Sequence, residues 1–167
     1  MDNNDLQLLF GYNQWANARV LNACSALPAE TLFAPAPISF GSIMGTLAHI
    51  LGAEIAWRQR MQEGISPTRL PDATDFSDLQ TLIACWKEEE AAMQHFIDGL
   101  DEAGASRVVA FTTLSGKPQH STLWKALAHV VNHGTAFRAE AGAALGALGH
   151  SPGDLDMIHY LRETDQR

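Results

Sequence analysis

Residues 121–149, STLWKALAHVVNHGTAFRAEAGAALGALG, decide the fold of this chain. At 100° per residue, the large apolar side chains of this stretch fall on one face of a helix. They are Leu123, Leu127, Val130, Val131, Leu145 and Leu148. Ser121 is expected to cap the helix, and Gly149 to end it after about Leu148. A long amphipathic helix of this kind needs partner helices to cover its apolar face.

Two histidines of the same stretch, His129 and His133, lie four residues apart, and Phe137 follows inside the apolar face. Side chains at this spacing are about one helical turn from each other, which is close enough to share a metal ion. A third ligand would have to come from another helix. Because H-x-x-x-H pairs are common and a histidine at a core edge often hydrogen-bonds a neighbour, the spacing alone leaves both interpretations open.

Three other segments show helical periodicity of apolar residues. They cover approximately residues 5–27, 42–63 and 77–100. Pro28 ends the first helix, and Ser42 or Ser39 can cap the second. Ser77 and Gln80 form the S-x-x-Q capping box of the third, whose exposed face is expected to hold the run Glu88 to Glu90.

The connections between the helices are long. Residues 28–39 are rich in proline and are expected to cross the bundle, with a short turn at 29–33, and residues 65–76 form a loop after Gly64 ends the second helix. Residues 107–118 predict a small β-hairpin with a turn at Ser115-Gly116.

A short helix at residues 155–162 is expected to dock on the outside. The sequence therefore predicts a single all-α domain over residues 1–167, a four-helix bundle with long crossover connections.

Composition restricts the partners. The net charge is −8, from 19 acidic and 11 basic residues, and no window gathers Lys and Arg, so nucleic acid and anionic membranes are not expected partners. No run of 18 apolar residues and no signal sequence is present, which predicts a cytoplasmic protein. Cys24 and Cys85 have no CxxC spacing and are expected to be reduced thiols.

The second helix offers two donors for a shared ion, His49 and Glu54. Glu54 falls among apolar residues, where an unpaired carboxylate would be costly. Either donor could complete a site with the two histidines of the last long helix, and His49, His129 and His133 together form one potential metal site. Imidazole ligands suit Zn, Ni or Fe, and three protein ligands leave a position for water, which is typical of catalytic sites. Motifs of di-iron bundles, zincins, serine hydrolases and nucleotide-binding proteins are absent from the sequence.

Several short motifs, which occur in order along the whole chain, together resemble the pattern of a known protein family. They are YNQWAN (12–17), GSI (41–43), TLAHI (46–50) with Glu54 and Trp57, HVVNHGT (129–135) with Arg138, LGH (148–150) and DMIHYL (156–161). In combination they resemble the DinB/YfiT-like superfamily. The resemblance implies a four-helix bundle, frequent homodimers, and a divalent metal held by one histidine of the second helix and two of the last long helix. It also implies enzymes that transfer or isomerise small electrophiles with a low-molecular-weight thiol.

One position departs from this pattern. The family's last long helix reads H-x-x-x-H-x-x-x-H-R, and its second and third histidines, which the resemblance implies to be ligands, map to His133 and Phe137. The prediction is therefore a metal-dependent enzyme for a small-molecule substrate, with His49, His133 and a replacement ligand, His129 or Glu54. The alternative is a non-catalytic dimeric stress or ligand-binding bundle that has lost the metal because Phe137 replaces a ligand.

Overall fold

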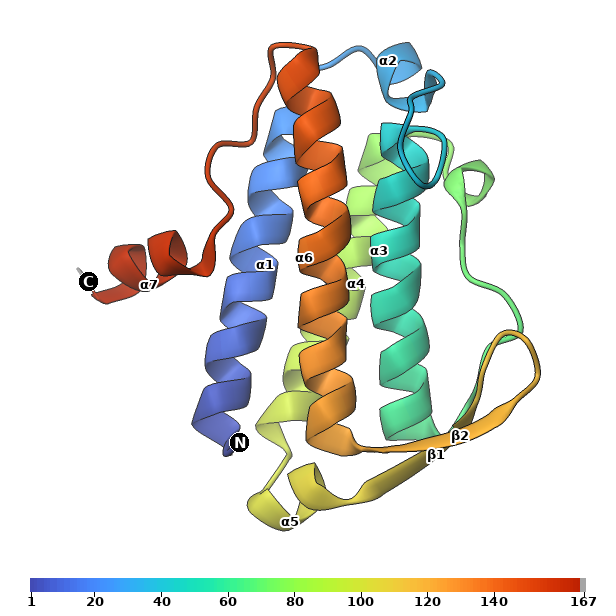
Figure 1. The fold of residues 1–167 in the computed structure, drawn as a ribbon, viewed down its shortest axis with the longest axis vertical. Helices are drawn as coiled ribbons and strands as arrows, with labels where there is room; N and C mark the ends of the chain where they lie inside the picture. Colours follow the sequence, from blue (N-terminus) through green and yellow to red (C-terminus); the bar gives the residue numbers. More distant parts are fainter. Residues whose placement is uncertain (166–167) are drawn as a thin grey trace.

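The computed structural model describes residues 1–165. Figure 1 shows four long helices side by side, α1 (Asn3–Ser25), α3 (Ile43–Arg58), α4 (Leu79–Asp98) and α6 (Leu123–Ala147). Helices α4 and α6 each pack against both α1 and α3, so the order around the bundle is α1, α6, α3, α4. Consecutive helices α1 and α3 therefore lie on a diagonal, while α1 and α6 run parallel (Figure 1). The predicted four-helix bundle with crossover connections is confirmed.

Short elements occupy the connections. α2 (Ala29–Phe33) interrupts the first crossing, α5 (Glu102–Ser106) follows α4, and α7 (Met157–Asp165) packs against α1. The predicted hairpin forms from β1 (Val108–Thr112) and β2 (Pro118–Thr122), which pair antiparallel. Gly116 takes a positive φ of 79° at its turn, a conformation that favours glycine.

The second predicted helix consists of α3 and a π-helical turn, η1 (Gln59–Glu63). Of the two predicted caps of α3, Ser42 and Ser39, the structure has Ser42, which accepts a hydrogen bond from the Gly45 backbone N–H at 2.9 Å. Gly64 ends the π-helical turn with a φ of 71°. The π-helical turn carries the side chain of Arg60 into a pocket that His129 and His133 also line.

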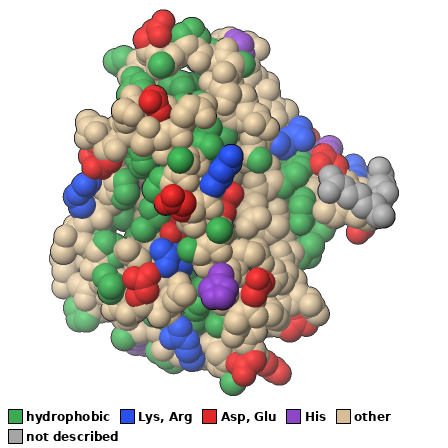
Figure 2. All heavy atoms as spheres, turned by 180° about the vertical axis from the view of Figure 1, so that it is seen from behind, with side chains coloured by type: hydrophobic (Ala, Val, Ile, Leu, Met, Phe, Trp, Pro, Cys, Tyr) green, Lys and Arg blue, Asp and Glu red, His purple; other side chains and the backbone are tan. Residues whose placement is uncertain are grey.

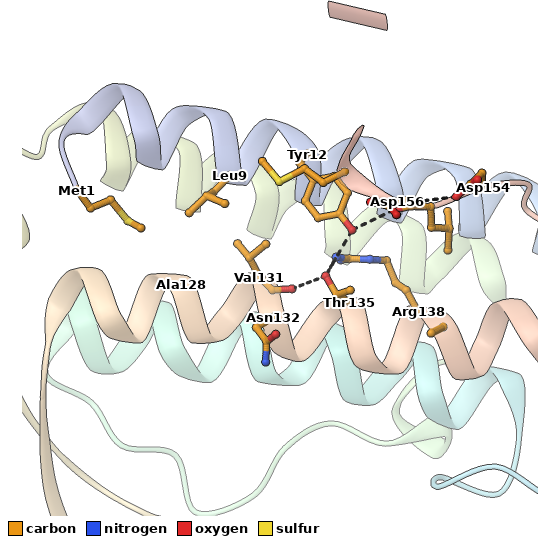
Figure 3. Close-up of a pocket in the computed structure, with 13 residues that line it drawn as sticks. Met1, Leu9, Tyr12, Ala128, Val131, Asn132, Thr135, Arg138, Asp154 and Asp156 are labelled. Atoms are coloured by element: carbon orange, nitrogen blue, oxygen red, sulfur yellow. Dashed lines mark hydrogen bonds between the residues drawn. The ribbon is translucent and has the colours of Figure 1, made fainter. Parts of the chain in front are cut away.

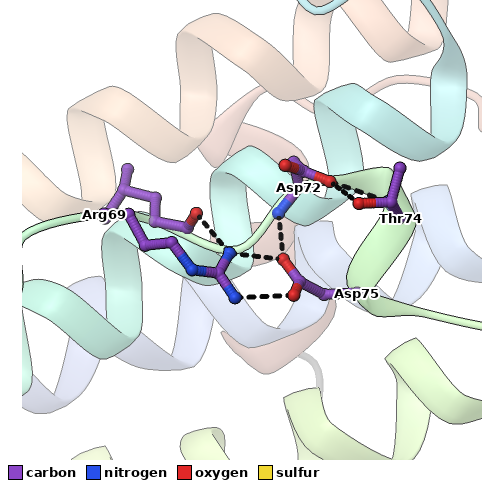
Figure 4. A network of polar contacts seen from close by, with 5 residues as sticks. Arg69, Asp72, Thr74 and Asp75 are labelled. Atoms are coloured by element: carbon purple, nitrogen blue, oxygen red, sulfur yellow. Dashed lines mark hydrogen bonds and ion pairs between the residues drawn. The ribbon is translucent and has the colours of Figure 1, made fainter.

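The loop before α4 is held by its own polar contacts. It contains a short 3-10 turn, η2 (Ala73–Asp75). Arg69 binds both carboxylate oxygens of Asp75 at 2.7 Å, and Asp72 accepts from the Thr74 backbone N–H at 2.8 Å (Figure 4). These contacts fix the loop that packs along α3.

Two predicted helix caps were wrong. The N-cap of α4 is Asp78, which accepts from the Thr81 N–H at 2.8 Å, because a carboxylate satisfies that N–H and also favours the positive end of the helix dipole. Ser77 lies one residue too early. Ser121 belongs to β2, where pairing with Val109 keeps its backbone extended, and α6 begins after Thr122 without a side-chain cap.

The run of glutamates was also misplaced. Glu88 is exposed, but Glu89 is 5% exposed and binds Arg58 Nε at 2.8 Å. The helical period explains the burial, since Glu89 follows Trp86 by three residues and precedes Met93 by four, and both are buried.

The core consists of two apolar clusters, one toward each end of the bundle. Along all four long helices, the residues between the clusters include buried polar side chains. They are Asn13, Asn17, Glu54, Glu89 and Arg138. The bundle thus has a polar layer near mid-height between two apolar layers.

The surface carries both signs of charge. On the face in Figure 2, Lys and Arg side chains are scattered and interspersed with Asp and Glu. Within residues 1–165, no helix is long and apolar enough to cross a membrane. Cys24 is buried and Cys85 is half-buried, and both are free thiols.

Candidate metal centre

The structure brings two of the three predicted ligands into direct contact. His49 on α3 and His133 on α6 are both half-buried, and their Nε2 atoms lie 3.1 Å apart. Two neutral imidazoles can share one hydrogen bond at this distance. Two ligands of one tetrahedral zinc ion, with bonds of about 2.0–2.1 Å, would be separated by about 3.3–3.4 Å, which is close to the observed distance. The pair therefore fits two neighbouring ligand positions of one ion.

Both rings are held neutral by their surroundings. Burial lowers the pKa of His133 to about 4, and the charges of His49, His129 and Arg138 add to the effect. Burial also lowers the pKa of His49, against the opposing influence of Glu140. At neutral pH these imidazoles have lone pairs available, because no proton competes strongly with a metal ion.

Two phenylalanines enclose the pair. The ring of Phe40 stacks on His49 with centroids 3.7 Å apart, and Phe137 lies 4.8 Å from His49 and 4.7 Å from His133. The Phe40 loop is fastened to α6 because Glu140 accepts from the backbone N–H and hydroxyl of Ser39, at 3.0 and 2.7 Å. Phe137 thus contacts both histidines from the position where the family resemblance implies a further histidine ligand.

The third predicted ligand, His129, adjoins the pair without joining it. Its ring centroid lies 5.8 Å from that of His133 and 5.2 Å from Trp57, and the residue is exposed. Across the described residues, 1–165, no group of three or more His, Cys, Asp or Glu side chains is arranged to hold a metal ion. The residues therefore fit an ion held by two assembled histidines, with the third donor set apart.

Glu54, the other candidate donor, is engaged elsewhere. Its Oε1 accepts from Asn13 at 2.7 Å and Asn17 at 3.2 Å, and its Oε2 accepts from the Trp86 indole N–H at 2.8 Å. These partners come from α1 and α4, on the core side of α3. Glu54 thus belongs to the polar layer and does not face His49.

Sequence reasoning assigned no role to Asn13 and Asn17. Both amides also accept from Arg138 Nη1, at 2.6 and 2.8 Å. Their spacing of four residues among buried apolar residues of α1 was the available signal, since two amides on one buried face need polar partners.

A pocket of about 410 Å³ opens beside the histidines, between η1, the loop before α4 and the β-hairpin. Its walls include Trp57, Arg60, Leu70, Phe111, His129 and His133. Although His129 is exposed overall, desolvation of its ring at the pocket wall and the Arg60 charge lower its pKa. The pocket is large enough for a small organic molecule.

A second pocket, of about 780 Å³, lies between α1, α6 and the segment before α7. Tyr12, Thr135 and Arg138 point toward one another in it (Figure 3), and Arg138 Nη2 donates to Thr135 Oγ1 at 3.1 Å. It contains none of the three histidines. The smaller pocket is therefore the one that adjoins the candidate metal centre.

Comparison with known proteins agrees with the fold and the motifs. The family model described as "DinB family" matches residues 1–167. Protein DinB from Bacillus subtilis (strain 168) is 22% identical over 166 residues, which cover 95% of each chain.

A solved structure gives the same topology. It is YfiT from Bacillus subtilis, described as a probable metal-dependent hydrolase with an unusual four-helix bundle topology. It superposes with a TM-score of 0.63 at 17% identity, covering 87% of this chain and 86% of that one. At this identity the likeness concerns the fold. Because the family model spans the entire sequence, this chain belongs to the DinB family.

Proposed function

We propose that this chain is a divalent-metal-dependent enzyme acting on a small molecule, with His49 and His133 as its assembled protein ligands and His129 as the third. The observation that carries the proposal is the 3.1 Å separation of the two Nε2 atoms across the α3–α6 interface. The description of YfiT as a probable metal-dependent hydrolase supports the same class of chemistry.

The chemistry would take place on the pocket side of the histidines. A bound divalent ion would supply activation of water, or of a low-molecular-weight thiol, as a nucleophile at neutral pH. His133 lies both in the histidine pair and in the pocket wall. Phe40 and Phe137 cover the pair and limit the approach of water. Hydrolysis and thiol-dependent transfer or isomerisation are the two reaction classes that suit this arrangement.

Metal analysis tests the proposal. Protein purified without chelator or nickel resin would be compared with His49→Ala and His133→Ala by elemental analysis after equilibration with Zn, Ni or Fe. His95→Ala, on the exposed face of α4, is the control. We expect a loss of at least about tenfold in metal affinity for the first two variants and none for the control. Equal metal content in all four proteins would refute the site.

A second candidate function has its own observation. Phe137 contacts both histidine rings, and its phenyl ring has no nitrogen lone pair to donate to a metal ion. The alternative is therefore a non-catalytic ligand-binding bundle in which the histidines share a hydrogen bond. In that case His49→Ala and His133→Ala would bind Zn, Ni and Fe no less tightly than the wild-type protein.

The homodimer implied by the family resemblance remains a prediction. Sedimentation velocity over a range of protein concentrations tests it directly.

A further inference from the structure

Arg60 is the most unusual side chain of the pocket beside the histidines. It projects from the π-helical turn η1 and is 7% exposed. Its guanidinium carbon lies 4.9 Å from the centroid of Trp57 and 5.4 Å from that of Phe111. Contact with the two rings fixes the position of the cation at the pocket wall.

The charge of Arg60 has no counter-ion among residues 1–165. Its Nε is buried without a hydrogen-bond partner, and burial lowers the pKa of Arg60 with no carboxylate opposing the effect. Arg58, two residues earlier, binds Glu89 at 2.8 Å and Glu63 at 2.7 Å. Because a buried cation without an anion is costly, the contrast with Arg58 indicates that Arg60 can bind a ligand that brings the negative charge.

The pocket is suited to such a ligand. Its described lining includes no Asp, Glu or Lys and no second Arg, so Arg60 is its only permanent charge. Trp57 and Phe111 provide aromatic walls, and His133 connects the pocket to the histidine pair. One guanidinium suits one negative charge, and its planar fork matches a carboxylate.

We infer that Arg60 is the anion-binding residue of this pocket and holds the carboxylate of a small substrate or co-substrate whose reacting group lies at His49 and His133. The inference rests on the proposed function for the place of reaction. Binding of the carboxylate itself needs no metal ion, because guanidinium and aromatic walls are present without one.

Benzoate and benzamide, which have the same size and differ in charge, are the probes. Binding to the full chain after chelator treatment would be followed by calorimetry and by the NMR shift of the Arg60 Nε–Hε group. We expect benzoate to bind at least about tenfold more tightly than benzamide and to shift that signal. Equal affinity for the two probes, or an unmoved signal, would overturn the inference without requiring any variant.

Variants extend the test. Arg60→Gln is expected to lose at least about tenfold in benzoate affinity, and Arg60→Lys to lose less because it keeps the charge. Arg162→Gln on the exposed face of α7 removes the same charge and should bind benzoate normally. Benzoate affinity that is unchanged in folded Arg60→Gln would refute the assignment, and inorganic phosphate binding more tightly than benzoate would refute carboxylate as the ligand class.

The two proposals fail separately. If the proposed metal site is wrong, the wild-type protein and the histidine variants will have equal metal content. The benzoate measurements do not depend on that result, because they use protein without metal. If the protein discriminates benzoate from benzamide but binds no metal ion, the assignment of Arg60 as an anion-binding residue stands and the proposed metal-dependent activity is refuted.

Discussion

Asn13 joins Arg138 to Glu54 in the middle of the bundle. Its Oδ1 accepts from Arg138 Nη1 at 2.6 Å, and its Nδ2 donates to Glu54 Oε1 at 2.7 Å. Asn17, one turn later, repeats both contacts at 2.8 and 3.2 Å. The buried cation and the buried carboxylate are therefore compensated through amides from α1, and this arrangement ties α1, α3 and α6 together.

Asn13→Ala is expected to destabilise the protein by about 2–4 kcal/mol, because it leaves a buried guanidinium and a buried carboxylate each short of a partner. Urea denaturation measures the loss. Asn22→Ala, at an exposed position of the same helix, is the control and should change stability by less than about 0.5 kcal/mol. If the two variants were equally stable, the amide link would contribute nothing.

Gly134 provides room for the same contacts. A Cβ at this position would lie 2.6 Å from Arg138 Nη1 and 3.0 Å from Asn13 Oδ1. Gly134→Ala should therefore displace both groups and cost about 1–3 kcal/mol, despite the better helix propensity of alanine.

Gly146 is the matched control for Gly134 on α6. A Cβ there would meet no atom within 4 Å, so Gly146→Ala should stabilise the protein by up to about 1 kcal/mol through helix propensity. Thermal unfolding of the two variants gives the comparison. A Gly134→Ala protein that melts as high as Gly146→Ala would show that the space is not required.

Glu90 should make stability depend on pH. Burial, and then the nearby Glu54, raise the pKa of Glu90 to about 7 from its ordinary 4.5. Folding therefore favours the protonated form. This contribution is fully present below pH 4.5 and is lost as the pH rises toward 7.

Glu90→Gln removes that dependence. Relative to the wild type, the variant should gain about 1–2 kcal/mol at pH 8, allowing for the partial exposure of Glu90, and nothing comparable at pH 4. Urea denaturation at the two pH values measures it. Glu88→Gln, on the exposed surface, should change stability little at either pH. A gain from Glu90→Gln that is the same at both pH values would contradict the titration.

Phe137→His tests whether the metal centre lacks a ligand. The Phe137 ring contacts both His49 and His133, so an imidazole at this position would add a donor directly beside the pair, whereas the His129 ring lies 5.8 Å from that of His133. We expect zinc affinity to rise by about tenfold or more, measured by competition with a chromophoric chelator. Phe137→Leu removes the ring without adding a donor and should show no gain. No gain from Phe137→His either would indicate that His129 already completes the natural site.

The sequence by itself determined the features that depend on neighbouring residues. Ser42, one of the two predicted caps, caps α3, and Gly64 ends the helical turn that follows, because capping and positive φ are local properties. The β-hairpin and the crossing connection also followed from proline, glycine and β-branched residues. Where two caps competed locally, as with Ser77 and Asp78, the pattern alone chose wrongly.

Tertiary structure decided what each polar side chain does. The motifs pointed to His49 and His133, but only the packing of α3 on α6 placed their Nε2 atoms 3.1 Å apart and left His129 beside Trp57. The Arg60 guanidinium packs against Phe111, which lies on the β-hairpin about fifty residues later in the chain, and this contact helps to bury the cation. Local sequence fixes backbone conformation, whereas partners for a buried charge come from distant segments, and their approach depends on how the helices pack.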